Sequence, residues 1–451
     1  MNIIIVGCGK VGYAIVSQLV LEGHTITVID KNKDRINSVL GGFDVMTYCG
    51  DGCSFSTLSS AGIEKADLFI ATMDSDEMNL LSCVMAKKKS SCKTICRVRN
   101  PIYMNDIDFL KRELTIDLII IPELDAADEC ARIFKFPSAS KIDVFLSERV
   151  ELVHFKVSES SELCNMKLCD IKSKTKCNVL ICMVTRNEDV FIPGGTFEIK
   201  EGDSIGVVGA PREVYAFFQK FGFSTKKASN VILVGGGRTG YYTARNLISS
   251  GIRVKIIESD RLRCEFLAEA IPEADIICGD GTAKDLLLEE GLENAAGLAA
   301  LTNIDEENLL LSMFAKNKTN VKTVTKVSRD SFNEIFSQLN LDSIIFPSHI
   351  VSDRVLQYVR SLQFTMGSDI ETFKKLGEGK AEAFSLIIKE KSKFTGVPLM
   401  KLKLKKNVLI CSISRKGKFI IPSGSDTIEV GDRIVIVHAN GQIKNIEEIL
   451  Q

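Results

Sequence analysis

The chain has 451 residues, more than a single hydrophobic core usually holds, so we expect several domains. Apolar residues make up 45% and charged residues 25% of the sequence, which are ordinary proportions for a soluble globular protein. A formal net charge of −1 offers no electrostatic footprint for nucleic acid, so no nucleic-acid partner is expected. The longest apolar runs, such as residues 3–6 and 118–121, are too short to span a bilayer, and no signal-peptide pattern opens the sequence. These features predict a cytoplasmic protein.

The first thirty residues predict a strand, a turn, a helix and a second strand. Residues 2–6 form a short apolar run rich in β-branched side chains, which is typical of a buried strand. A glycine-rich turn, Gly-Cys-Gly-Lys-Val-Gly, follows at residues 7–12, and apolar side chains then recur at helical spacing over residues 11–21. Residues 25–29 predict the second strand, which leads into Asp30. We expect one βαβ unit with a right-handed crossover.

Strands and helices continue to alternate up to residue 121. Further strands are predicted at residues 45–49, 68–71, 94–98 and 118–121, with a helix at residues 79–87. Short strands that alternate with helices of about 10 to 15 residues indicate a doubly wound parallel sheet.

The same order of elements then recurs. A second glycine-rich turn, Gly-Gly-Gly-Arg-Thr-Gly, occupies residues 235–240, and its first glycine stands 228 residues after Gly7. Strands are predicted at residues 230–234, 254–257, 275–278, 298–301, 323–327 and 343–346, with a helix at residues 239–248. The chain is therefore interpreted as a tandem duplication.

A proline and a helix follow each predicted sheet, at Pro122-Glu123 and at Pro347-Ser348. The second of these helices carries an apolar stripe at helical spacing, formed by Val351, Val355, Tyr358, Val359 and Leu362. A helix that leaves a finished domain with such a stripe needs a partner surface. Packing on its own sheet is the alternative, and the sequence leaves both open.

A strand-rich module of about 80 residues follows each nucleotide-type half. Residues 179–208 align with residues 408–437 at a constant offset of 229, and a short polar linker at residues 224–229 joins the two repeats. The predicted fold class is α/β, with two tandem Rossmann-like doubly wound sheets, each followed by a small α+β module. The predicted domains are residues 1–135, 140–224, 229–362 and 370–451.

The spacing Gly-x-Gly-x-x-Gly between a strand and a helix is typical of a site for a nucleotide pyrophosphate. The first glycine permits the tight turn, the second lets a phosphate approach the backbone, and the third lets the helix pack on the strand. Unpaired N–H groups at the helix start then attract the phosphates. Asp30 and Glu258 end the second strand of each copy and can accept hydrogen bonds from ribose hydroxyls. An acid there favours NAD or ATP/ADP over NADP.

Polar residues also follow the later strands, at the edge of the sheet where ligands of open α/β folds bind. Asp51 and Asp280, each within a Gly-Asp-Gly run, are candidates for the site or simple turn formers. Asp76-Glu77 with Asn79, and Asp305-Glu306 with Asn308, are interpreted mainly as helix caps. Arg97 and Lys326 are aligned cations that could neutralise a phosphate, although a surface ion pair is nearly as good an interpretation.

Catalytic and metal-binding patterns are absent from the sequence. A nicotinamide dehydrogenase needs a proton donor or acceptor beside the ring, and none of the four histidines recurs in both copies. Fourteen cysteines are present without a Cys-x-x-Cys motif, and we interpret them as buried apolar residues and a few exposed thiols in a reducing cytosol. No catalytic residue and no metal site are predicted.

Taken together, these motifs resemble those of tandem RCK (regulator of potassium conductance) proteins, the regulatory subunits of Trk potassium-uptake systems. The resemblance covers all 451 residues as two N-type and two C-type domains in alternation. It implies NAD(H), and also ATP/ADP, as ligands that gate the transporter. It further implies peripheral attachment to the inner face of the membrane through a Trk-type potassium transporter, and a homo-oligomeric ring built through crossover helices, expected to be a tetramer.

Carried over position by position, the resemblance implies two nucleotide sites. The first comprises Gly7, Cys8, Gly9, Lys10, Val11, Gly12, Asp30, Asp51, Gly52, Thr72, Met73 and Arg97. The second comprises Gly235, Gly236, Gly237, Arg238, Thr239, Gly240, Glu258, Asp280, Gly281, Thr302, Asn303 and Lys326. Because lysine makes a point contact where arginine can make two, the first site is expected to be the better phosphate site.

Two other functions remain as alternatives. The glycine motif alone would also suit an NAD-dependent oxidoreductase. The cysteines of the first repeat would suit a redox-sensing transcription factor, but no basic helix-turn-helix pattern is evident. The sequence leaves open which nucleotide binds at each site, whether the modules bind a second ligand, and the sign of regulation.

Overall fold

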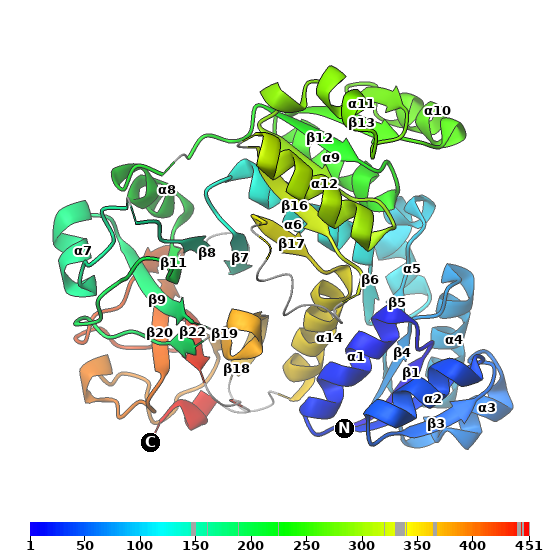
Figure 1. Ribbon diagram of the computed structural model, residues 1–451. Coiled ribbons are helices and arrows are strands. Elements are labelled where there is room, and N and C mark those ends of the chain that lie inside the picture. Colours follow the sequence, from blue (N-terminus) through cyan, green and yellow to red (C-terminus); the bar gives the residue numbers. More distant parts are fainter. Residues whose placement is uncertain are drawn as a thin grey trace.

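A computed structural model describes the chain except residues 146–149, 160, 188, 224, 320, 330–338, 340, 364–367, 440–442, 444–445 and 451. Ser224 and Gln451, at which the predicted second and fourth domains end, lie outside the described residues. Two parallel sheets and two antiparallel modules make up the molecule (Figure 1).

The first parallel sheet has the strand order β3-β2-β1-β4-β5-β6. Its strands are β1 (Asn2–Val6), β2 (Thr25–Asp30), β3 (Met46–Cys49), β4 (Leu68–Ala71), β5 (Lys93–Arg97) and β6 (Leu118–Ile120). Its helices are α1 (Lys10–Leu21), α2 (Lys33–Gly42), α3 (Phe55–Ser60), α4 (Asp76–Lys89) and α5 (Ile107–Glu113), with 3-10 turns η1 (Ile63–Lys65) and η2 (Pro101–Asp106). All five strand pairs are parallel, so the predicted doubly wound sheet is confirmed.

The second parallel sheet repeats this order as β14-β13-β12-β15-β16-β17. Its strands are β12 (Asn230–Val234), β13 (Arg253–Glu258), β14 (Asp275–Cys278), β15 (Gly297–Ala300), β16 (Lys322–Lys326) and β17 (Ser343–Ile345). Its helices are α9 (Arg238–Ser249), α10 (Arg261–Ala270), α11 (Lys284–Glu289) and α12 (Asp305–Lys318), with the 3-10 turn η3 (Leu292–Asn294). Both central strands are apolar and buried because helices cover both faces of such a sheet.

Each module is a five-stranded antiparallel sheet. The first contains β7 (Lys141–Phe145), β8 (Val150–Lys156), β9 (Val179–Arg186), β10 (Asp189–Phe191), β11 (Ser204–Gly209), α7 (Leu168–Thr175) and α8 (Pro211–Lys220). The second contains β18 (Ser368–Leu376), β19 (Ala381–Ile388), β20 (Val408–Arg415), β21 (Lys418–Ile420) and β22 (Arg433–Ala439), with 3-10 turns η4 (Gly377–Gly379), η5 (Leu399–Lys401) and η6 (Ile446–Ile449). Apolar side chains of both sheets, including Cys182 and Cys411, share one buried cluster, so the modules pack on each other.

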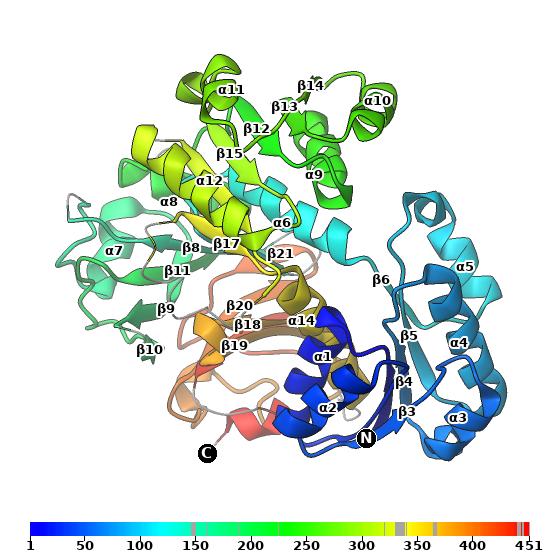
Figure 2. The same cartoon turned by 45° about the vertical axis from the view of Figure 1, so that its right-hand side comes forward.

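The helices that follow the parallel sheets are exchanged between the two halves. Helix α6 (Pro122–Lys135) leaves the first sheet and buries Cys130 and Phe134 in the core of the second, against α9. Helix α14 (Pro347–Gln363) leaves the second sheet and buries Val355 and Val359 in the core that surrounds α1. Figure 2 shows α14 beside α1 and α6 beside α9. The apolar stripe therefore has a partner surface, which α1 of the other half forms together with the second module of its own half.

Candidate functional site

The two glycine-rich turns have the backbone that their spacing predicts. Gly7 and Gly235 have positive φ angles of 88° and 104°, a backbone conformation that residues other than glycine rarely adopt. A Cβ atom on Gly12 would lie 2.0 Å from the carbonyl oxygen of Gly7, and one on Gly240 would lie 2.1 Å from that of Gly235. The first and third glycines are thus required by the fold itself.

The middle glycines leave open space instead. A Cβ atom on Gly9 would lie 3.8 Å from its nearest neighbour, Nη1 of Arg35, and one on Gly237 would meet nothing within 4 Å. Gly9 and Gly237 are the N-cap residues of α1 and α9, so no side-chain oxygen occupies the start of either helix. The backbone beside Gly9 and Gly237 is therefore open at the starts of α1 and α9, where the first N–H groups of a helix lack intrahelical partners.

A carboxylate at the end of the second strand is held against each turn. Oδ2 of Asp30 accepts a hydrogen bond from the N–H of Cys8 at 2.6 Å, and Oδ1 accepts one from the N–H of Asn32 at 2.8 Å. In the second half, Oε2 of Glu258 accepts from the N–H of Gly236 at 2.8 Å. Oε1 of Glu258 accepts from Ser259 and Asp260, while Oε2 of Glu258 and both oxygens of Asp30 each accept one hydrogen bond and can accept another from a ribose hydroxyl.

The Gly-Asp-Gly runs form turns below the first strand of each sheet. Asp51 accepts the N–H of Cys53 at 2.9 Å, and Asp280 accepts the N–H of Thr282 at 2.9 Å. These backbone hydrogen bonds are the main cause of a lowered pKa at both aspartates. A Cβ atom on Gly52 would lie 2.0 Å from Cγ1 of Val6, which shows how closely the turn packs on the strand. Both aspartates are turn formers, and Asp280 also lines a cavity.

The acidic residues at the starts of α4 and α12 do not cap these helices, so the prediction that they are helix caps was wrong. Oδ2 of Asp76 accepts the N–H groups of Arg99 and Asn100 at 2.9 and 2.7 Å, which fixes the loop after β5. Ser75 caps α4 instead, by accepting the N–H of Met78. In the second half, Asp305 likewise accepts the N–H of Ser328 at 2.9 Å.

The buried amide of Asn79 ties together the ends of β4 and β5. It accepts the N–H of Met73 at 2.7 Å and donates to the carbonyl of Arg97 at 3.0 Å. Asn308 makes the matching bonds to Thr302 and Lys326 at 2.9 Å each. These two asparagines therefore position the predicted site residues of the fourth and fifth strands.

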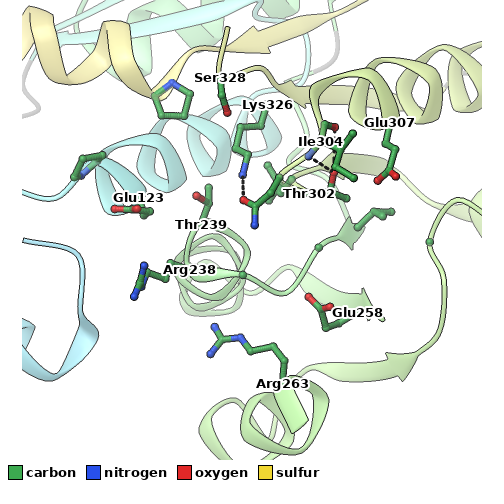
Figure 3. A pocket seen from close by; sticks show the side chains of 18 of the residues that line it. Glu123, Arg238, Thr239, Glu258, Arg263, Thr302, Ile304, Glu307, Lys326 and Ser328 are labelled. Carbon is green, nitrogen blue, oxygen red and sulfur yellow. Dashed lines mark hydrogen bonds between the residues drawn. The ribbon is translucent and has the colours of Figure 1, made fainter. Parts of the chain in front are cut away.

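A cavity of about 860 Å³ lies over the second glycine turn, and both halves of the chain line it (Figure 3). Predicted second-site residues in its wall are Gly235, Gly237, Arg238, Thr239, Glu258, Asp280, Gly281, Thr302, Asn303 and Lys326. The first half contributes Lys10, Val11, Arg97, Arg99, Pro122 and Glu123. Figure 3 shows Glu123, from α6, and Arg238, from α9, on one side of this pocket. Gly236 and Gly240 are not among the residues that line it.

A second cavity, of about 310 Å³, lies at the first glycine turn. Of the residues predicted for this site, Gly7, Asp30, Gly52 and Met73 line it. Thr72 lies beneath the turn, where its hydroxyl donates to the carbonyl of Gly7 at 2.7 Å. Lys10, Val11 and Arg97 point to the larger cavity, so the structure brings together only part of the predicted first site here.

The aligned cations Arg97 and Lys326 both lie in the large cavity. Burial is the main cause that lowers the pKa of Lys326 to about 8, and its Nζ lies 3.5 Å from Oδ1 of Asn303. Burial also lowers the pKa of Arg97, whose Nε is buried without a hydrogen-bond partner among the described residues. A buried donor without a partner next to a large cavity fits an anionic ligand.

Two further arginines at the sites were missed from the sequence. Arg35 bridges Asp30 and Asp74 at 3.7 and 3.6 Å in the smaller cavity. Arg263 lines the larger cavity and donates from Nε to the carbonyl of Gly236 at 2.8 Å. They stand 228 residues apart, the offset of the glycine turns, and that shared offset was the signal that could have found them.

Among the described residues, no helix is long and apolar enough to cross a membrane, and no group of three or more His, Cys, Asp or Glu side chains could hold a metal.

Two nucleotide-type sheets in tandem, each followed by an antiparallel module, define a tandem RCK protein. The family model for the TrkA-N domain matches residues 3–122 and 231–347, and the model for the TrkA-C domain matches residues 152–222 and 384–451. The chain therefore belongs to the TrkA family.

Full-length relatives agree with this assignment. The chain is 31% identical to the Trk system potassium uptake protein TrkA homolog of Archaeoglobus fulgidus, over 100% of both chains. It is 28% identical to the Trk system potassium uptake protein TrkA of Haemophilus influenzae, over 100% of this chain and 98% of the relative. These relatives are potassium-uptake proteins by name, so the chain belongs with that family and not with enzymes.

Solved structures show the same fold. The GsuK channel bound to NAD matches with a TM-score of 0.64 at 15% identity, covering 97% of this chain and 77% of that one. GsuK bound to ADP matches with a TM-score of 0.51 at 12% identity, covering 79% and 69%. The predicted fold class is confirmed, and the oxidoreductase alternative finds no support among these proteins.

Proposed function

We propose that this chain is a nucleotide-binding regulatory subunit that gates a Trk-type membrane potassium transporter. The observation that carries the proposal is the large cavity, because residues of both halves line it. A ligand held between two halves is sensitive to their relative position. The names of the full-length relatives supply the link to potassium uptake.

An adenine nucleotide fits the residues of this cavity. The N–H groups at the start of α9 would bind the pyrophosphate, and Glu258 would accept from the ribose hydroxyls. Lys326, Arg238 and the first half's Lys10 and Arg99 would neutralise phosphate charge. NAD(H) and ATP/ADP share these groups, and both ligand types occur in the names of the GsuK structures.

The first glycine turn is proposed as a second site in each chain. Its open middle glycine and its acid match those of the second half, although its cavity is smaller. Two sites per chain give eight in the tetramer that we propose. A ligand gates only if it binds two arrangements unequally, and a full shift needs about a 10⁴-fold preference in total. Spread over eight sites, that is roughly threefold per site.

The exchanged helices supply a route from the sites to the modules. Helix α1 begins at the first glycine turn and packs on α14, which in turn contacts β18 of the second module. A change in the position of α1 would therefore reach the module through packed helices. We propose that the chain attaches to the inner face of the membrane only through its transporter partner.

Reconstituted vesicles that contain a Trk-type membrane subunit provide the test. We expect the chain to copurify with that subunit and to make uptake of a rubidium tracer depend on ADP, ATP or NADH. The double variant Gly9→Val/Gly237→Val should still copurify but should leave uptake insensitive to nucleotide. Uptake that ignores nucleotide in the wild type would contradict the proposal. Substrate-dependent formation of NADH by the purified chain would support the oxidoreductase alternative instead.

A further inference from the structure

Two cysteines meet at the acid of the second nucleotide site. Cys278 is the last residue of β14, and the strand register places it directly beside Glu258 of β13. Cys264 lies in α10, and its Sγ donates a hydrogen bond to the carbonyl oxygen of Glu258 at 3.3 Å. Cys278 also lies close enough to Cys264 to raise the pKa of its thiol. One helix and one strand thus place a thiol each beside the same residue, Glu258.

The two thiols differ in their access to solvent. Cys278 is exposed, whereas Cys264 is buried. Burial, followed by the neighbouring Cys278, raises the pKa of Cys264 to about 11. The exposed thiol is therefore the one that meets a soluble oxidant first, and the buried one is placed to react in a second step.

We propose that Cys264 and Cys278 form a reversible disulfide that weakens nucleotide binding at the second site. The oxidant is a small-molecule disulfide of the glutathione type. The Cys278 thiolate attacks one sulfur of that disulfide, which breaks its S–S bond and releases one small thiol. The Cys264 thiolate, after losing its proton to water, attacks Cys278 and releases the second small thiol. Two cysteines are oxidised and one small disulfide is reduced to two thiols.

The effect on the second site follows from the neighbours of the pair and rests on the proposed nucleotide binding. Arg263, directly before Cys264, donates to the carbonyl of Gly236 in the glycine turn at 2.8 Å. The turn of Gly279 to Gly281, directly after Cys278, contributes Gly281 to the cavity wall. A new S–S bond replaces the hydrogen bond from Cys264 to Glu258 and pulls both segments together. We expect about a fivefold loss of affinity, the lower end of measured coupling between sites.

The first half contains an internal comparison. Ile36 occupies the position of Cys264, and Cys49 occupies that of Cys278. The thiol of Cys49 donates to the carbonyl oxygen of Lys31, and that of the nearby Cys53 donates to the carbonyl oxygen of Met78. No disulfide is therefore expected at the first site, and oxidation should affect the two sites unequally.

Mass spectrometry tests the proposal on the full-length protein. Cleavage after Arg263 and Lys284 places both cysteines on one tryptic peptide, residues 264–284. After treatment with oxidised glutathione and alkylation, this peptide should carry no alkyl label and should be lighter than the reduced peptide by two hydrogen atoms. Peptide 36–65, which contains Cys49 and Cys53, should carry labels or glutathione but no internal disulfide. A Cys264→Ala variant should accumulate glutathione on Cys278.

Nucleotide binding is then measured on a Gly9→Val background, so that only the second site is titrated with ADP. Oxidation should lower its affinity about fivefold, and a reducing agent should restore it. Cys278→Ser, an exposed and conservative change, should bind equally under both conditions. Glutathione left on Cys278 of the wild type, unreacted thiols, or a disulfide without loss of affinity would overturn the proposal. Absence of ADP binding in the reduced protein would instead contradict the proposed function, while the peptide masses still decide whether the disulfide forms.

Discussion

The two halves of the chain share one scaffold but form unequal cavities. The cavity at the first turn is about 310 Å³ and that at the second about 860 Å³. In the first half, Arg35 lies between Asp30 and Asp74. In the second half, Asn303 occupies the position of Asp74, and Arg263 occupies that of Arg35. Arg263 donates to the carbonyl oxygen of Gly236 in the glycine turn. The larger cavity is lined by both halves and the smaller one by the first half alone, so the setting of a repeated turn differs even where its backbone is the same.

The halves also differ in the ion pairs that α14 and α6 make. Arg360 of α14 is buried and donates to Glu22, at the end of α1, at 3.0 and 2.7 Å. It also donates to Glu382 of β19 at 2.9 Å with two nitrogens, and His438 contacts the same carboxylate at 2.9 Å. Burial opposes ionisation of Glu382, but the bonds from His438 and Arg360 lower its pKa. The matching position of α6, thirteen residues after its first proline, is Lys135.

The largest expected effect concerns this network. Arg360→Met should lower the free energy of unfolding by about 3–5 kcal/mol, because two carboxylates then remain buried without their cation. Chemical denaturation followed by circular dichroism measures the loss. Lys135→Met, the matched change in α6, should cost about 1 kcal/mol or less. Equal losses for the two variants would show that the halves are held alike.

The next effect distinguishes the two sites by their middle glycines. Gly237→Val should weaken ADP binding at the second site by about 3 kcal/mol, roughly a hundredfold, because the side chain fills the phosphate space. Gly9→Val with Asp30→Ala should do the same at the first site. Thermal unfolding of the two single glycine variants should stay close to that of wild type, since neither glycine has a close neighbour. The double variant should stay folded but unfold at a lower temperature, because Asp30 accepts the N–H groups of Cys8 and Asn32. Gly240→Ala is the control and should destabilise the fold. Unchanged ADP binding by Gly237→Val would show that the phosphate does not bind at this turn.

A smaller effect tests whether the halves share the large cavity. Arg99 belongs to the first half, pairs with Glu123 at 2.7 Å and lines the second cavity. On a Gly9→Val background, Arg99→Ala should weaken ADP binding by about 1.5 kcal/mol, roughly tenfold, through loss of one charged contact. Arg112→Ala, on the exposed surface of α5, is the control and should have no effect. An unchanged affinity for Arg99→Ala would mean that the second half binds its ligand alone.

The smallest effect is a pH dependence that only the second half should show. Lys326 has a pKa of about 8 in the free protein, so it is charged at pH 7 and largely neutral at pH 9. A bound phosphate favours the charged form and must recruit a proton above pH 8. Affinity should therefore fall several-fold, and at most about tenfold, between pH 7 and 9. Lys326→Arg, which installs the residue found at position 97, should flatten the profile, and a flat wild-type profile would exclude Lys326 from phosphate binding.

Much of this fold was predictable because its strands are locally encoded. The apolar β-branched runs at Asn2–Val6 and Asn230–Val234 match β1 and β12 to the residue. Helix α2 was missed because its capping residue, Asn32, lacks a strong apolar run after it. The aligned offset located the glycines and the acids, since each is required by its own turn.

The shared cavity was not predictable from local patterns. The stripe on α14 indicates that the helix is covered, but helical periodicity does not specify by which half. The resemblance assigned Lys10 and Arg97 to the first site, whereas in the folded chain both line the second cavity. Long-range packing of this kind depends on contacts between segments more than a hundred residues apart.

A crystal structure of the chain with ADP is the most direct test of the shared cavity. The account predicts a pyrophosphate at the start of α9, a ribose on Glu258, and Lys10 or Arg99 of the first half within hydrogen-bond distance of the phosphates. A nucleotide held by second-half residues alone, or a large cavity that stays empty while ADP occupies the first turn, would contradict it.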